Sequence, residues 1–117
     1  MPSDPARTPL RDILHHIDLA EAFTAGFDVE RFGSDLRAVY AVTRCLEIIS
    51  EASRRLPSTL KERHPSIAWS RMAGAGNVYR HDYEDVAASF VWHTVQISLP
   101  PLRTVVEQEL TRLGDPP

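Results

Sequence analysis

The sequence predicts an all-α fold, an up-and-down bundle of four to five helices. Its prolines leave two long stretches, 10–56 and 66–99, without any. Because proline interrupts helices, these are the stretches in which long helices can run. Apolar residues recur in both at intervals of three and four positions, whereas the alternation of apolar and polar residues that is typical of a strand persists nowhere.

The first expected helix begins near Thr8. Thr8 is the predicted N-cap, and Pro9 falls in the first turn, where its missing N–H costs nothing. Leu10, Ile13, Leu14, Ile17 and Ala20 form one apolar stripe along this helix. Gly26 is the expected stop.

The second expected helix is long and runs from Asp28 to Leu56. Asp28 is a suitable N-cap, and Pro57 ends the helix. We expect a weak point at Gly33, because glycine is a poor helix former.

The C-terminal half is divided by a polar break at 80–85. Ser66 is a plausible cap for a third helix, which contains two glycines near its end, Gly74 and Gly76. Apolar residues from Val86 to Leu99 predict a fourth helix. A fifth follows the pair Pro100-Pro101 and extends to Leu113, so we expect the chain to break at the two prolines.

Composition limits the class of protein. The chain has 117 residues, of which 43% are hydrophobic and 25% charged, so we expect one folded domain over 1–117 whose ends, 1–6 and 114–117, fray. A single cysteine, Cys45, excludes a disulfide within the chain and a zinc site built from cysteines; a buried, inert thiol is expected. No apolar run is long enough to cross a bilayer, and no signal peptide is recognisable, so we expect a cytoplasmic protein.

The net charge of −3 provides no general attraction for nucleic acid, so any RNA contact must come from a local patch. The densest polar cluster occupies 77–85 and contains Arg80, His81 and Tyr83. Histidine can exchange a proton near neutrality, as activation of an RNA 2′-hydroxyl requires, and arginine can hold the phosphate. Alternatively, the cluster is an ordinary polar turn between helices.

Part of this region resembles the HepT-type toxins of the HEPN superfamily. The residues that carry the resemblance are Ile67-Ala68-Trp69, Gly74, Asn77 and His81-Asp82-Tyr83. The resemblance implies a small helical bundle that forms a homodimer and acts as a metal-independent RNA endonuclease without a cofactor, the toxin of a type VII toxin–antitoxin system. The implied partner is a minimal nucleotidyltransferase antitoxin of the MNT type, which uses ATP to adenylylate a tyrosine of the toxin. His81 is then the catalytic histidine, and Tyr83 is the residue that is modified.

The sequence departs from this family at one position. The family motif places an arginine before the histidine with four to six residues between them, directly before Asn77, and this chain has Gly76 there. Arg80 adjoins His81 and would not share its helix face, so it could replace the missing arginine only through an irregular backbone or from the other subunit. Arg71, ten residues before His81, is a possible supporting residue together with Asn77.

Three functions therefore stay open. The favoured one is an RNA endonuclease with His81 and Arg80 in the catalytic site. The second is a binding subunit with the same fold and partner that has lost catalysis with the arginine. The third is a nucleotide-binding helical subunit that supports a transferase.

Among the other histidines, His64 is expected to be ordinary surface, and His93 to lie at the edge of the core or at an interface. Trp69 is expected to serve in packing.

Overall fold

The computed structural model describes residues 4–73 and 84–117, and all regular structure within them is helical. The helices are α1 (Arg7–Thr24), α2 (Val29–Ser34), α3 (Leu36–Arg54), α4 (Ser58–Glu62), α6 (Glu84–His93), η1 (Thr94–Ser98) and α7 (Leu99–Arg112). Residues 69–73 form one further helical turn, and η1 is a stretch of π-helix. The all-α prediction is confirmed.

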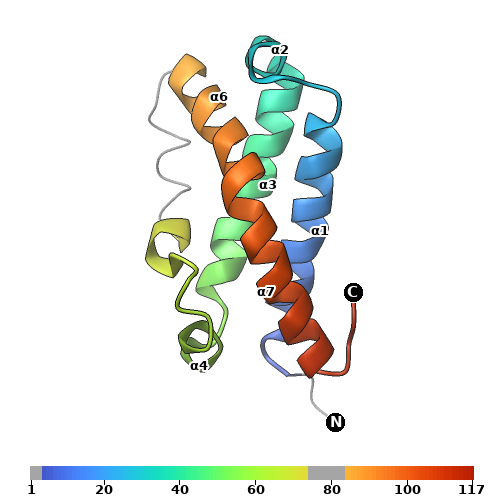
Figure 1. Ribbon diagram of the computed structural model, residues 1–117, viewed down its shortest axis with the longest axis vertical. Coiled ribbons are helices and arrows are strands. Elements are labelled where there is room, and N and C mark those ends of the chain that lie inside the picture. Colours follow the sequence, from blue (N-terminus) through green and yellow to red (C-terminus); the bar gives the residue numbers. More distant parts are fainter. Residues whose placement is uncertain (1–3, 74–83) are drawn as a thin grey trace.

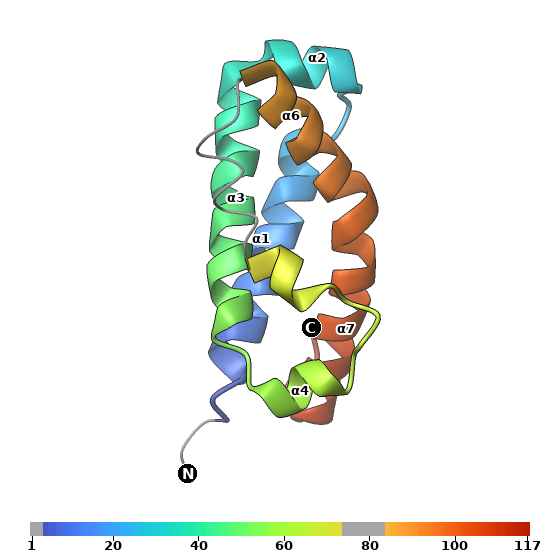
Figure 2. The same cartoon turned by 90° about the vertical axis from the view of Figure 1, so that its left-hand side faces the viewer.

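Three long segments run along the long axis of the molecule: α1, α3 and a continuous rod formed by α6, η1 and α7 (Figure 1). Helix α1 packs against both α3 and α7, while α6 packs against α2 and α3. α1 runs antiparallel to α3 and to the rod, as in an up-and-down bundle. Figure 2 shows that the chain after α4 passes beside α7 and returns to α3 as the turn 69–73.

The core lies between these three segments. Fully buried aliphatic side chains include Leu10 and Ile17 of α1, Ile49 of α3 and Leu102 of α7, and burial of each contributes about 1.5–3 kcal/mol. Cys45 is buried in the same core, and burial raises the pKa of its thiol, so the expectation of a buried thiol is confirmed.

Helix α1 begins differently from the prediction. Thr8 is exposed and lies inside the helix, so the expectation that it caps the helix is wrong. The first turn instead follows Asp4, whose carboxylate accepts a hydrogen bond from the Ala6 N–H at 2.8 Å. Pro9 is buried in the first turn, as expected. The helix ends at Thr24, and Gly26 follows with φ +82°, a conformation that glycine adopts without strain.

The predicted long helix 28–56 is broken at Asp35 rather than at Gly33. Asp28 caps α2 by accepting a hydrogen bond from the Arg31 N–H at 2.8 Å, as predicted. Asp35 caps α3 in the same way, accepting from the Ala38 N–H at 3.0 Å. A side chain that binds the free N–H groups of a new helix favours a change of direction more than one glycine within a helix does.

The expected break at Pro100-Pro101 is absent. Both prolines lie in the first turn of α7, and the helix continues through them from α6. They have no N–H to donate to the carbonyls of Gln96 and Ile97 four residues earlier. The chain widens into a π-helix at this point, where the Leu99 N–H donates to the carbonyl of Thr94. The prolines therefore change the pitch of the rod without ending it.

Helix α1 and the C-terminal residues are joined by Arg11, whose guanidinium lies 2.7 Å from the carboxylate of Asp115. Its Nη2 also donates to the carbonyl of Pro116 at 3.0 Å. Fraying of the two ends stays a prediction.

None of the helices within 4–73 and 84–117 combines the length and the hydropathy of a membrane span.

Candidate functional site

Four of the predicted site residues, Asn77, Arg80, His81 and Tyr83, lie outside the described residues, as does Gly76. The fifth, Arg71, lies in the helical turn 69–73. The structure therefore shows how the chain is held on either side of the predicted motif, up to Ala73 and from the start of α6.

A buried carboxylate fixes the chain after α4. Glu109 of α7, whose side chain is 5% exposed, accepts hydrogen bonds from Nη2 and Nε of Arg63 at 2.6 and 3.3 Å. Its second partner is Nε2 of His64, at 2.6 Å. Burial acts to raise the pKa of the Glu109 carboxyl, but the hydrogen bonds from Arg63 and His64 outweigh it, so the pKa lies below its usual value. The expectation that His64 is ordinary surface is wrong, because its side chain is 15% exposed and bound to Glu109.

Two further contacts hold the segment that leads to the motif. The indole N–H of Trp69 donates to the carbonyls of His64 and Lys61 at 3.0 and 3.2 Å, and its ring packs against the core. The packing role predicted for Trp69 is confirmed. Beyond it, the hydroxyl of Ser50 on α3 donates to the carbonyl of Ala73 at 3.0 Å. The chain is thus bound to α7 at one end of this segment and to α3 at the other.

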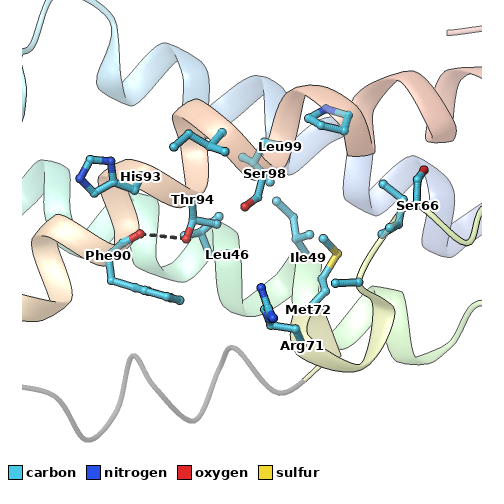
Figure 3. A pocket seen from close by; sticks show the side chains of 14 residues that line it. Leu46, Ile49, Ser66, Arg71, Met72, Phe90, His93, Thr94, Ser98 and Leu99 are labelled. Carbon is cyan, nitrogen blue, oxygen red and sulfur yellow. Dashed lines mark hydrogen bonds between the residues drawn. The ribbon is translucent and has the colours of Figure 1, made fainter.

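Between this segment, α3 and the rod lies a pocket of about 390 Å³ (Figure 3). Its walls are mostly apolar. Leu46 and Ile49 contribute from α3, Met72 from the turn, and Phe90 and Ile97 from the rod. Ile97 is 67% exposed although it is aliphatic, so the apolar wall extends to the molecular surface.

Five of the described residues that line this pocket are polar: Arg71, His93, Ser66, Ser98 and Thr94, whose hydroxyl donates to the Phe90 carbonyl at 2.8 Å. In Figure 3 the imidazole of His93 points away from the other labelled side chains. No described lining residue is acidic. Arg71 therefore places a positive charge at the pocket in a protein whose net charge is −3. His93, expected at a core edge or an interface, is exposed here.

Sequence reasoning identified Arg71 but missed the pocket, because its walls come from three separate segments. Each wall residue, taken alone, fits a helix face that packs in the core. A signal was present in Pro100-Pro101, which force the local widening at η1, since π-helical turns are frequent at functional sites. Within the described part of the chain, no group of three or more His, Cys, Asp or Glu side chains is placed to hold a metal ion.

Comparison with known proteins finds relatives along nearly the whole chain. The family described as "Ribonuclease HepT-like" matches residues 13–109. "Putative RNase MJ0125" of Methanocaldococcus jannaschii is 33% identical over 115 residues, 98% of this chain and 99% of that protein. "Probable ribonuclease HepT" of Thermococcus cleftensis is 38% identical over 99 residues, 85% of this chain and 90% of that protein. No solved structure shows significant similarity. The region matched by the family contains both the pocket and the predicted motif.

Proposed function

The chain belongs to the HepT-like ribonuclease family, and from this membership we propose that it is a metal-independent RNA endonuclease, the toxin of a toxin–antitoxin pair. The observation that carries the proposal is the family match over residues 13–109, joined by relatives named as ribonucleases that align over nearly their full length. The presence of His81 within that region adds a residue able to move a proton.

The proposed reaction is attack of an RNA 2′-oxygen on the adjacent phosphorus. His81 accepts the proton of the 2′-hydroxyl or donates one to the leaving 5′-oxygen. The new 2′-O–P bond forms as the P–O5′ bond breaks, which gives a 2′,3′-cyclic phosphate and a 5′-hydroxyl. Arg80, supplied from the second subunit of a homodimer, binds the phosphate and stabilises its developing charge, with Asn77 in a supporting role.

The proposed control is covalent. A minimal nucleotidyltransferase antitoxin transfers adenylate from ATP to the hydroxyl of Tyr83, and pyrophosphate leaves. Tyr83 is two residues from His81, so the added phosphate brings negative charge to the place where the RNA phosphate must bind. Modification is then expected to block RNA binding.

The test is cleavage of a defined RNA by the purified chain in excess EDTA. Wild-type protein is expected to produce fragments ending in a 2′,3′-cyclic phosphate, and His81→Ala is expected to abolish them. His15→Ala is the matched control, because His15 is exposed on α1 and lies 66 positions before His81 in the sequence. Cleavage that persists in His81→Ala, or that stops with EDTA, would contradict the proposed mechanism.

A second function is favoured by one observation, the glycine at position 76. If the chain cannot catalyse cleavage because it lacks this arginine, it is a binding subunit of the nucleotidyltransferase. In that case the wild-type chain binds the transferase and cleaves no RNA, whereas Gly76→Arg restores cleavage.

A further inference from the structure

We propose that the pocket between α3, residues 66–72 and the α6–η1–α7 rod is a subsite for one nucleobase of single-stranded RNA. The inference deepens the proposed function and rests on it for the identity of the nucleic acid. All the residues that carry it are described by the structure, and none belongs to the motif at 76–83.

The size and the walls of the pocket fit a base. Sites for small molecules commonly enclose about 300–1,000 Å³ and are mostly apolar with a few polar groups, and this pocket of about 390 Å³ lies in that range. Phe90, 38% exposed, and the aliphatic side chain of Ile97, 67% exposed, offer surfaces against which a flat ring can pack. Proteins that bind single-stranded RNA commonly stack unpaired bases on aromatic side chains, of which Phe90 is one.

The rim supplies groups for the polar parts of a nucleotide. The hydroxyls of Ser66 and Ser98 make no hydrogen bond within the described part of the chain, so they are available to the edge of a base. Arg71 and His93 are the ionisable side chains among the described lining residues, and neither is held in an ion pair there. The positive charge of Arg71, with no carboxylate among the described lining residues, complements the phosphate that accompanies each base.

This geometry gives Arg71 a role different from that of the family arginine. Its guanidinium lies at the mouth of the pocket (Figure 3), two residues before the point at which Ser50 binds the Ala73 carbonyl. We therefore expect the Arg71 guanidinium to bind a phosphate beside the bound base. Through this contact Arg71 selects and orients the RNA. Its loss is expected to raise KM more than it lowers kcat.

Direct binding can be followed at Met72, a pocket residue and one of two methionines in the chain. Protein labelled with ¹³C at the methionine methyl groups gives one signal from the pocket and a reference signal from Met1. Each of the four nucleoside 5′-monophosphates is expected to shift the Met72 signal in a saturable manner. Ribose 5-phosphate and inorganic phosphate, which lack the base, are expected to leave it unchanged.

The variants change the exposed rim, so the fold is expected to persist. Ile97→Glu introduces a carboxylate at the mouth, and Ile97→Gln is its matched neutral control. We expect Ile97→Glu to weaken nucleotide binding about tenfold relative to Ile97→Gln, as loss of about 1.4 kcal/mol would. Arg71→Gln is expected to weaken it to a similar extent, and Arg71→Lys less. Circular dichroism of each variant verifies folding.

Nucleotide binding at Met72 and cleavage of RNA are separate readouts. Nucleotides that bind while no RNA is cut would support the subsite and contradict the ribonuclease. RNA cleavage without any nucleotide-dependent shift of Met72 would overturn the subsite alone. A Met72 shift that depends on protein concentration and is unaffected by nucleotides would also overturn it, because the pocket would then be a contact between two copies of the chain.

Discussion

Replacing Glu109 by glutamine should destabilise the fold in a manner that depends on pH. The carboxylate is 5% exposed and accepts three hydrogen bonds, two from Arg63 and one from His64. Hydrogen bonds to charged groups contribute about 1.5–3 kcal/mol, against about 0.5–1.5 kcal/mol for neutral ones. Arg63 is 37% exposed, so solvent screens part of its attraction. We therefore expect Glu109→Gln to lower the free energy of unfolding by about 2–3 kcal/mol near neutral pH.

The pH dependence has a definite sign. The pKa of Glu109 is lowered in the folded state, so its contribution is fully present above the unfolded pKa of about 4.3 and is lost as the pH falls through the folded pKa. The stability difference between wild type and Glu109→Gln should be constant at higher pH and should narrow below about pH 4.3.

Urea unfolding followed by circular dichroism from pH 7 to pH 3 measures this difference. Glu107→Gln is the matched control, because Glu107 lies two residues away on α7 and makes no hydrogen bond or ion pair in the described structure. Equal stabilities of wild type and Glu109→Gln at pH 7, or a difference that does not change on acidification, would refute the reasoning.

Four other results are expected. If the phosphate contact was lost with the family arginine, Gly76→Arg should raise RNA cleavage about 10²–10³-fold, the effect of one contact to a developing anion, and adding His81→Ala should remove the gain. Mass spectrometry after incubation with the antitoxin and ATP should detect adenylate on the wild-type chain but not on Tyr83→Phe. In thermal unfolding, Asp35→Ala should lower stability by about 1 kcal/mol through loss of the α3 cap. Gly33→Ala should raise it by up to about 1 kcal/mol, since the Ala88 Cβ, at 3.9 Å, is the one described atom that a Cβ at Gly33 would meet. Light scattering should give a solution mass at least twice 13.2 kDa, and a monomer at micromolar concentration would exclude a composite site.

Helical periodicity predicted the elements well because it reports which face of a helix is buried, and burial is what stabilises these helices. The stripe from Leu10 to Ala20 and the cap at Asp28 both occur in the structure as predicted. Helix ends were less predictable, because several polar residues compete for each end. Thr8 and Asp4 are both suitable for the start of α1, and only the packing of the helix determines which is used.

Contacts between distant segments could not be read from local patterns. The partners of Glu109 lie 45 and 46 residues earlier, and nothing in the segment around His64 distinguishes it from a surface loop. The pocket was not predicted, because its walls also come from segments that are distant in the sequence. Arg71 was identified from its place near the motif, but its position at a pocket mouth depends on how α3 and the rod pack.

The packing of α1 has a consequence for synthesis on the ribosome. α1 rests on α3 and on α7, and the carboxylate that binds Arg11 belongs to a residue 104 positions later. As the chain emerges, α1 can pair with α3 early, but one side of its apolar stripe remains uncovered until residues 99–112 have left the exit tunnel. Because exposed apolar surface of a nascent chain favours aggregation and chaperone binding, chains truncated before α7 should be bound by chaperones or degraded.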